Sequence, residues 1–170
     1  YSMHADISRT VPVVGRFNPL QKILYEIVLE VQTTYETWVK PGPTMRSLNT
    51  RAWDLLNALV KSRFLSRGGK WKKPYGEAPH GISHLIGEAV HDGDPFGDFR
   101  DLPMEVGWLI SNEPGLYGEF SIALKGRKWK EHLGIRIEDN LLVTKTGCEN
   151  LSGMIPKGIL DLEKRLTRST

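Results

Sequence analysis

Two stretches early in the chain repeat apolar residues at the spacing of an α-helix. The first carries, in order, Leu20, Ile23, Leu24, Ile27, Val31, Tyr35 and Trp38. Asn18 suits the capping position before it, Pro19 suits its first turn, and the Pro-Gly-Pro sequence at 41–43 ends it. The second begins after Thr44 and places on one side Leu48, Ala52, Leu55, Leu56 and Leu59. We predict two amphipathic helices whose apolar stripes belong to the core.

Elsewhere the pattern is that of strands and loops. Residues 7–14, ahead of the first helix, are rich in β-branched side chains and end at Gly15, which predicts a strand. Residues 66–79 are rich in Gly and Lys and predict a loop. Residues 106–112 are apolar enough for a buried strand, and the Pro-Gly pair at 114–115 would stop it.

The most regular alternation comes later in the chain. Ile135 and Ile137 alternate with Arg136 and Glu138. Because side chains of a strand point to opposite faces in turn, the isoleucines share one face and the polar pair shares the other. This arrangement predicts that one face is buried and that the other carries charge.

The end of the chain predicts a hairpin and a short helix. The sequence Lys-Thr-Gly at 145–147 supplies a turn between strands at 141–144 and 148–151. Residues 158–168 predict a short polar helix. Two helices followed by mainly antiparallel strands indicate an α+β domain.

The composition describes one globular body. A chain of 170 residues, 39% apolar and 25% charged, has enough material for a core, so we predict a single domain over residues 1–170. With one cysteine, Cys148, no internal disulfide can form, which favours a reducing, cytoplasmic setting. No apolar run approaches the length needed to cross a membrane. A homo-oligomer is left open.

The positive charge raises the question of nucleic acid, since the net charge is +3 and the pI is about 9.0. The basic residues gather at 63–73 and 125–130, each with one tryptophan, Trp71 or Trp129. Both clusters stand beside glycine, in sequence typical of solvated loops. We therefore predict no nucleic-acid partner, and we leave open whether either tryptophan borders a substrate cleft.

The candidate chemistry lies in a histidine-rich segment. His80, His84 and His91 are three of the five histidines, and carboxylates follow at Glu113 and Glu138. Imidazole nitrogen and carboxylate oxygen together form the ligand set of many hydrolytic metal centres. Each residue alone has a simpler interpretation, because a lone histidine can be structural and a lone glutamate can lie in a turn or at a solvated strand edge.

In their order, these motifs resemble the signatures of the pita-bread metallopeptidases, family M24, in the branch of aminopeptidase P and prolidase. The matching segments are residues 5–12, 80–91, 112–117, 134–140 and 142–151. The likeness runs from about Ala5 to Pro156 and so covers nearly the whole chain. It implies the pita-bread fold, incomplete at its N-terminal side, with these residues forming the C-terminal part of the catalytic domain.

The resemblance implies a centre of two divalent metal ions, with Asp6, His84, Glu113 and Glu138 as ligands. A hydroxide bridging the ions would be the nucleophile. One imidazole among several carboxylates favours Mn²⁺, with Co²⁺ or Zn²⁺ able to substitute. The family has a further metal-binding aspartate that would precede Tyr1. We therefore expect the second ion to lack a ligand here and the chain to be weakly active or inactive.

The same resemblance assigns roles to residues around the metals. His91 would bind the scissile carbonyl or its oxyanion, and His80 would contact the substrate beyond the cleaved bond. Glu113 would pass a proton to the leaving amine. Arg136 would orient Glu138 or bind substrate. The remaining histidines, at positions 4 and 132, are predicted at the surface.

The implied activity is that of a metal-dependent exopeptidase acting on peptides with proline in the second position. The residues do not separate an aminopeptidase P from a prolidase, which splits dipeptides ending in proline. A non-catalytic pita-bread module that binds peptides or a protein is the alternative from another class. A creatinase-like hydrolase without metal is disfavoured, because Asp6, His84, Glu113 and Glu138 are all retained.

Overall fold

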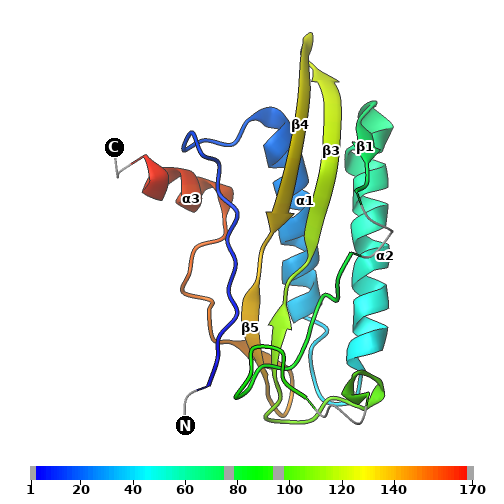
Figure 1. The fold of residues 1–170 in the computed structure, drawn as a ribbon, viewed down its shortest axis with the longest axis vertical. Helices are drawn as coiled ribbons and strands as arrows, with labels where there is room; N and C mark the ends of the chain where they lie inside the picture. Colours follow the sequence, from blue (N-terminus) through cyan, green and yellow to red (C-terminus); the bar gives the residue numbers. More distant parts are fainter. Residues whose placement is uncertain (1–2, 75–78, 94–97, 168–170) are drawn as a thin grey trace.

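The computed structural model describes residues 3–74, 79–93 and 98–167. Two long helices, α1 (Pro19–Glu36) and α2 (Met45–Arg63), pack beside a long β-hairpin made of β3 (Gly115–Leu124) and β4 (Arg127–Arg136), as Figure 1 shows. A last helix, α3 (Ile159–Leu166), lies at the opposite edge of the view from α2 (Figure 1), and its Glu163 pairs with Lys22 of α1 at 3.4 Å. Among the described residues, no helix is both long and apolar enough to span a membrane.

All strands pair antiparallel in two three-stranded sheets. One sheet has the order β1-β3-β4, with β1 at Lys70–Lys72. The other has the order β2-β5-β6, with strands at Leu109–Asn112, Asp139–Val143 and Cys148–Asn150. Short 3₁₀ turns lie at Leu65–Arg67 and Phe99–Asp101. The predicted α+β class is therefore confirmed.

Both predicted helices and their caps are confirmed. The Asn18 side chain accepts the backbone N–H groups of Leu20 and Gln21, and the Gln21 side chain accepts the Asn18 N–H at 3.0 Å. This reciprocal pair satisfies donors that the first helical turn leaves free. Thr44 caps α2 by accepting the Ser47 N–H at 3.1 Å.

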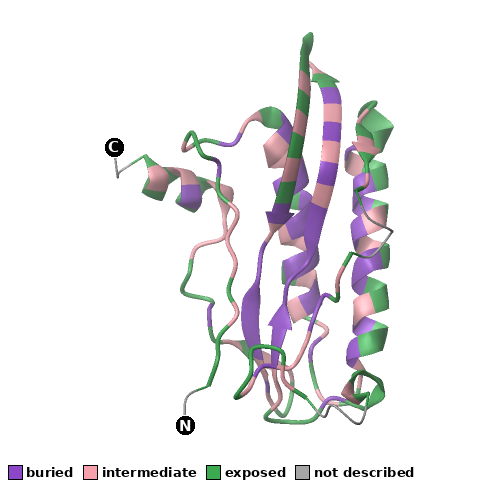
Figure 2. Cartoon of the chain, viewed as in Figure 1, coloured by how far each residue is buried: buried purple, intermediate pink, exposed green. Residues whose placement is uncertain are grey.

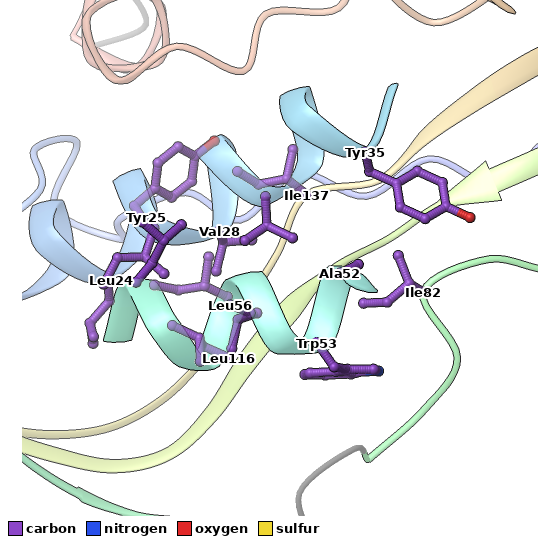
Figure 3. Close-up of a cluster of buried hydrophobic side chains, with 14 of the residues drawn as sticks. Leu24, Tyr25, Val28, Tyr35, Ala52, Trp53, Leu56, Ile82, Leu116 and Ile137 are labelled. Carbon is purple, nitrogen blue, oxygen red and sulfur yellow. The ribbon is translucent and has the colours of Figure 1, made fainter. Parts of the chain in front are cut away.

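Most residues of the predicted apolar stripes are buried in the core, and Ile23, Trp38 and Leu55 are half-buried against it. Figure 3 shows Val28 of α1 and Leu56 of α2 close to Leu116 of β3 and to Ile137. Figure 2 shows the same division along the chain, with the buried side of each helix turned toward the strands. Trp38 is half-buried and lies beyond the end of α1, so the helix is shorter than its apolar pattern.

The two sheets meet at a break in the hydrogen-bond ladder. Asn112 pairs with Asp139 in one sheet, and Gly115 pairs with Arg136 in the other. Between these pairs, Glu113 and Pro114 stand opposite Ile137 and Glu138. Proline has no N–H to donate, so the ladder cannot continue through this point. Both glutamates therefore lie where the chain passes from one sheet to the other.

The predicted strand at 7–14 is wrong. This segment is extended but forms only one isolated bridge, between Arg9 and Ile137. The segment lies against the ladder break. There its side chains make several of the hydrogen bonds that hold it, including those of Ser8 to Glu138 and of Thr10 to the backbone of Arg136. Val13 and Val14 are exposed, so their β-branched character does not reflect burial in a sheet.

The prediction of a loop at 66–79 is also partly wrong, because this range contains the strand β1. Residues 75–78 of the range lie outside the described part of the chain. Trp71 of β1 points inward, stacks on Phe120 at 5.7 Å and donates its ring N–H to the Tyr117 carbonyl. Its neighbours Lys70 and Lys72 are exposed. The predicted solvated loops at 63–73 and 125–130 thus include strand residues, since lysines alternating with an inward tryptophan have the period of a strand.

The other strand predictions are confirmed with different bounds. The apolar run at 106–112 contains β2, and the turn at 145–147 joins β5 to β6. The alternation at 135–138 places Ile135 and Ile137 in the core. The terminal helix follows Gly158 as predicted, and residue 168 lies outside the described part.

We expect Cys148 to react slowly with alkylating reagents at pH 8. Burial, followed by the charge of Glu36, raises the pKa of this thiol to about 11, so about one thiol in a thousand is ionised at that pH. A free cysteine is ionised to about a quarter under the same conditions. Iodoacetamide labelling should therefore be at least about 100-fold slower in the folded than in the urea-unfolded protein. Equal rates would contradict this environment.

Candidate metal centre

Two segments flank the ladder break and bring further side chains to the two glutamates. The backbone N–H of Glu113 donates to the carbonyl of Ile82, at 2.9 Å, which fixes the histidine segment on one side. The backbone N–H of Glu138 donates to the carbonyl of Ser8, at 3.0 Å, which fixes the N-terminal segment on the other. Residues from four distant parts of the sequence therefore surround one point.

The four predicted metal ligands lie together at this point. His84 Nε2 is 3.2 Å from Glu113 Oε1 and 3.4 Å from Asp6 Oδ2. One candidate donor atom each from His84, Glu113 and Glu138 lies within 4.8 Å of the others, and the same holds for Asp6, His84 and His91. Each of these residues lies just beyond a strand end or in an extended segment.

Two buried atoms of the cluster fit a bound cation. His84 Nε2 and Glu138 Oε1 are inaccessible to solvent, and neither makes a hydrogen bond of regular geometry within the described part of the chain. The other ring nitrogen, Nδ1, lies 3.0 Å from the Leu85 carbonyl, which fits a proton on Nδ1 and leaves Nε2 free to bind a metal. Buried polar atoms without partners are costly, so a cation held here would satisfy both.

The charges of the cluster also favour a cation. Burial, together with the charges of Glu113 and Asp6, raises the pKa of Glu138 to about 7, although a hydrogen bond from Ser8 opposes the rise. Burial alone would raise the pKa of Glu113, but contact with His84 and the charge of Arg136 lower it overall. Burial alone would lower the pKa of His84, but its carboxylate neighbours raise it overall. Crowded carboxylates repel one another, and a divalent cation relieves that repulsion.

Comparison with known proteins decides the family. The model of metallopeptidase family M24 matches residues 1–145, which is most of the chain. The chain belongs to metallopeptidase family M24. The chain is 37% identical over 164 residues to intermediate cleaving peptidase 55, mitochondrial, of Arabidopsis thaliana, covering 95% of this chain and 32% of that protein. It is 34% identical to Xaa-Pro aminopeptidase 3 of Rattus norvegicus, covering 98% and 33%.

Solved structures give the same answer for the fold. Aminopeptidase P from E. coli with the inhibitor Pro-Leu matches with a TM-score of 0.78 and 29% identity, over 98% of this chain and 39% of that chain. Zinc-substituted E. coli aminopeptidase P in complex with product matches with a TM-score of 0.77 and 29% identity, over 97% and 38%. The predicted pita-bread fold is thereby confirmed. The chain spans about a third of the length of these curated relatives.

Within this M24 domain, Tyr117 connects three of the predicted residues, although the sequence analysis gave it no role. His80 Nε2 lies 3.0 Å from the Tyr117 hydroxyl, and Arg136 Nε donates to the same oxygen at 2.9 Å. Arg136 Nη1 is 3.2 Å from Glu113 Oε2. We expected Arg136 to orient Glu138. The described contacts pair Arg136 with Glu113.

Two glycines make room for the Tyr117 ring. A Cβ atom on Gly115 would lie 2.3 Å from the Tyr117 hydroxyl, and one on Gly134 would lie 2.9 Å from its Cδ1 atom. Gly134 also stands directly opposite Tyr117 in the β3–β4 register. The glycines flanking these motifs were the sequence signal that could have identified Tyr117.

We expect Gly134→Ala to displace Tyr117 and leave the fold intact. The added methyl group would meet the ring edge, so the hydrogen bonds to His80 and Arg136 should weaken. In histidine-ring NMR spectra the His80 resonances should shift, and thermal unfolding should change by no more than a few degrees. Gly147→Ala is the matched control, since a Cβ atom there meets nothing within 4 Å. Unchanged His80 resonances would contradict the prediction.

Two serines also contact the candidate ligands and were missed. Ser8 Oγ donates to Glu138 Oε2 at 2.6 Å. Ser111 Oγ accepts the His84 backbone N–H at 2.9 Å and lies 3.3 Å from Glu113 Oε1. Small hydroxyl residues carry little sequence signal, so only the folded arrangement identifies them.

A buried charge network behind Glu138 centres on Asp139, which has no exposed side-chain surface. Its carboxylate pairs with Arg9 at 2.6 Å and with Lys157 at 2.6 Å. It also accepts hydrogen bonds from Gln32, Asn150 and Ser152. Arg9 Nη1 in turn donates to the carbonyls of Ser8 and Glu138. Arg9 therefore pairs with Asp139 and fixes the backbone of Ser8 and of the candidate ligand Glu138.

The next residue, Asn140, holds the backbone of Asp6. The Asp6 N–H donates to Asn140 Oδ1 at 3.2 Å, and Asn140 Nδ2 donates back to the Asp6 carbonyl. The consecutive residues Glu138, Asp139 and Asn140 thus provide a candidate ligand, an anchor for Arg9 and an anchor for Asp6. A contiguous motif in sequence therefore organises a distant segment.

The remaining histidines lie beside the cluster or at the surface. The ring of His91, an exposed residue, lies edge-on to that of His84, with centroids 4.3 Å apart, at the open side of the cluster. His80 is half-buried and packs edge-on against Trp53 at 5.8 Å; burial lowers its pKa. His4 and His132 are exposed, as predicted.

Proposed function

We propose that this domain hydrolyses the peptide bond between an N-terminal residue and proline with the help of bound divalent metal. The observation that carries the proposal is the convergence of Asp6, His84, Glu113 and Glu138, where two buried atoms have no regular hydrogen bond to any described residue. Membership of a metallopeptidase family supports a hydrolytic role for that cluster.

Asp6, His84, Glu113 and Glu138 would hold the divalent metal. Manganese is the favoured metal, because one imidazole among carboxylates is a hard, oxygen-rich ligand set, and Co²⁺ or Zn²⁺ would substitute. When bound, the metal would lower the pKa of a water molecule and so supply the nucleophile at neutral pH.

Glu113 is the group that would receive the proton of the attacking water and hand it to the leaving amine. The charges of Arg136 and His84 lower its pKa, so Glu113 is ionised and ready to accept a proton at neutral pH. Arg136, 3.2 Å from its second oxygen, would hold the carboxylate in place during the transfer.

His91 and His80 would bind the substrate on either side of the cleaved bond. His91, exposed beside His84, would donate to the scissile carbonyl oxygen as negative charge develops there. His80, held by the Tyr117 hydroxyl, would contact the residue after the bond together with Arg136. Similarity to proteins named Xaa-Pro aminopeptidase supports peptides with proline in the second position as substrates.

The test is the release of the N-terminal residue from Ala-Pro-Ala-Ala by the Mn²⁺-loaded protein, followed by mass spectrometry over long incubation. We expect slow release that EDTA abolishes and that does not occur with Ala-Ala-Ala-Ala. The matched control is Glu113→Gln, which keeps the shape of the side chain and removes its base.

Stoichiometric metal with no release from either peptide would refute the enzymatic proposal. In that case, selective binding of the proline peptide without cleavage would favour the non-catalytic binding module.

A further inference from the structure

The outward face of the β1-β3-β4 sheet carries a row of basic side chains that begins beside the candidate metal centre. Along β4, every second residue points to this face, which brings Arg136, His132, Lys130 and Lys128 into line. The residues between them, such as Trp129 and Leu133, are half-buried and pack against the core. Arg136 is the member that contacts Glu113.

The strand register extends this row across the sheet. Lys72 of β1 stands opposite Glu119 of β3, and Glu119 stands opposite His132 of β4. Two residues further from the centre, Lys70 stands opposite Ser121, and Ser121 stands opposite Lys130. Tyr117, two residues nearer the centre than Glu119, lies on the same face. The successive rows are about 7 Å apart, because each strand residue advances the chain by about 3.4 Å.

The charge of this face is largely uncompensated. Within the described residues, Lys70, Lys72 and Lys128 form no ion pair, and the carboxylate on the face, that of Glu119, is paired with Lys130 at 3.1 Å. All four lysines are exposed. A ligand on this face would meet positive potential from its first contact onward.

We propose that these four lysines, called here the cationic sheet face, select peptides with acidic residues downstream of the cleaved bond. This inference rests on the proposed function, because it uses the candidate metal centre to fix the N-terminus of the peptide. An extended peptide also advances about 3.3 Å per residue, so alternate residues coincide with successive rows. If the second residue lies beside Tyr117, acidic side chains at positions four and six reach the rows of Lys72 and Lys70.

The size of the effect follows from the exposure of these charges. An exposed ion pair contributes about 0.2–1 kcal/mol, which is up to about fivefold in affinity for each pair. Salt screens such pairs, since the Debye length falls from about 30 Å at 0.01 M to about 8 Å at 0.15 M. Selection for acidic residues should therefore be strong at low ionic strength and weak at high ionic strength.

The experiment compares Ala-Pro-Ala-Glu-Ala-Glu with Ala-Pro-Ala-Gln-Ala-Gln, each with a C-terminal fluorophore, against the Mn²⁺-loaded protein. Affinity is measured by fluorescence anisotropy at low and high salt, and cleavage is recorded in the same samples by mass spectrometry. We expect the acidic peptide to bind about fivefold more tightly at low salt. We expect the difference to vanish in Lys70→Glu/Lys72→Glu.

The matched control is Lys40→Glu/Lys145→Glu, which changes the net charge equally at exposed positions outside this sheet. The control should keep the preference, and circular dichroism should show that both variants are folded. Equal affinity for the two peptides, or equal loss of preference in both variants, would overturn the inference. Tighter binding of a single-stranded oligonucleotide than of the acidic peptide would overturn it in favour of a nucleic-acid surface.

The two proposals fail in different ways. If both peptides are cleaved without any preference, the cationic sheet face is wrong and the proposed function stands. If neither peptide is cleaved but the acidic one binds through Lys70 and Lys72, the surface inference stands and the enzymatic proposal is wrong.

Discussion

His84→Ala is expected to lose bound divalent metal almost completely. His84 Nε2 lies within 3.4 Å of carboxylate oxygens of both Asp6 and Glu113. His84 also supplies the imidazole of the group formed by His84, Glu113 and Glu138. Removing it leaves three carboxylates close together with no neutral donor between them. Loss of a ligand of this kind lowers metal affinity by more than the 10–100-fold typical of an outer-shell change.

The measurement is metal content by elemental analysis after dialysis against Mn²⁺ or Zn²⁺. Glu138→Ala should behave in the same way, since its buried Oε1 has no regular hydrogen-bond partner in the described chain. His132→Ala is the control, because His132 is exposed on β4 outside the cluster. Unchanged metal content in both ligand variants would remove the basis for a metal centre here.

Asp139→Asn is expected to lower the free energy of unfolding by about 3–5 kcal/mol, the cost of removing one partner of a buried ion pair. Arg9 and Lys157 would each lose their closest carboxylate contact, and the side chains of Asp139 and Arg9 are 0% and 11% exposed. The amide can still accept hydrogen bonds but carries no charge to balance the two cations.

Urea unfolding followed by tryptophan fluorescence measures this loss. Asp54→Asn is the matched control, an exposed aspartate on α2 whose replacement should change stability by less than about 0.5 kcal/mol. Metal affinity should also fall, because Arg9 holds the backbone carbonyls of both Ser8 and Glu138. A stability equal to that of the unmodified protein would show that the network is not needed for the fold.

The sequence was sufficient where structure depends on neighbouring residues. Asn18 and Thr44 cap their helices through contacts within the first helical turn, so local chemistry identifies both starts. Ile135 and Ile137 alternate with polar residues over a few positions, which is enough to assign their faces.

The sequence was not sufficient where partners come from far along the chain. Residues 7–14 have strand-forming side chains, but the backbone they lie against is the ladder break, so only the Arg9–Ile137 bridge forms. Lys70 and Lys72 resemble a solvated loop until β3 supplies the strand beside them. Strand pairing is a property of two segments, and one segment cannot specify it alone.

The residues of the candidate site also fall into two groups, those that the sequence identified and those that only the fold identified. Asp6, His84, Glu113 and Glu138 were recognised as a set from motifs, yet the supporting residues Ser8 and Asp139 have no distinctive spacing. Their relevance depends on hydrogen bonds across more than one hundred positions of sequence in the case of Ser8 and Asp139.

The two helices, the faces of the last long strand and the order of motifs that marks the M24 family can all be read from the residues in order. The break in the ladder between Glu113 and Glu138, and the binding of the N-terminal segment to it by Asp139 and Asn140, become visible only in the folded chain. The reason is physical. Helix caps and alternation are short-range, whereas the position of a buried charge is set by the partners that the whole fold brings to it.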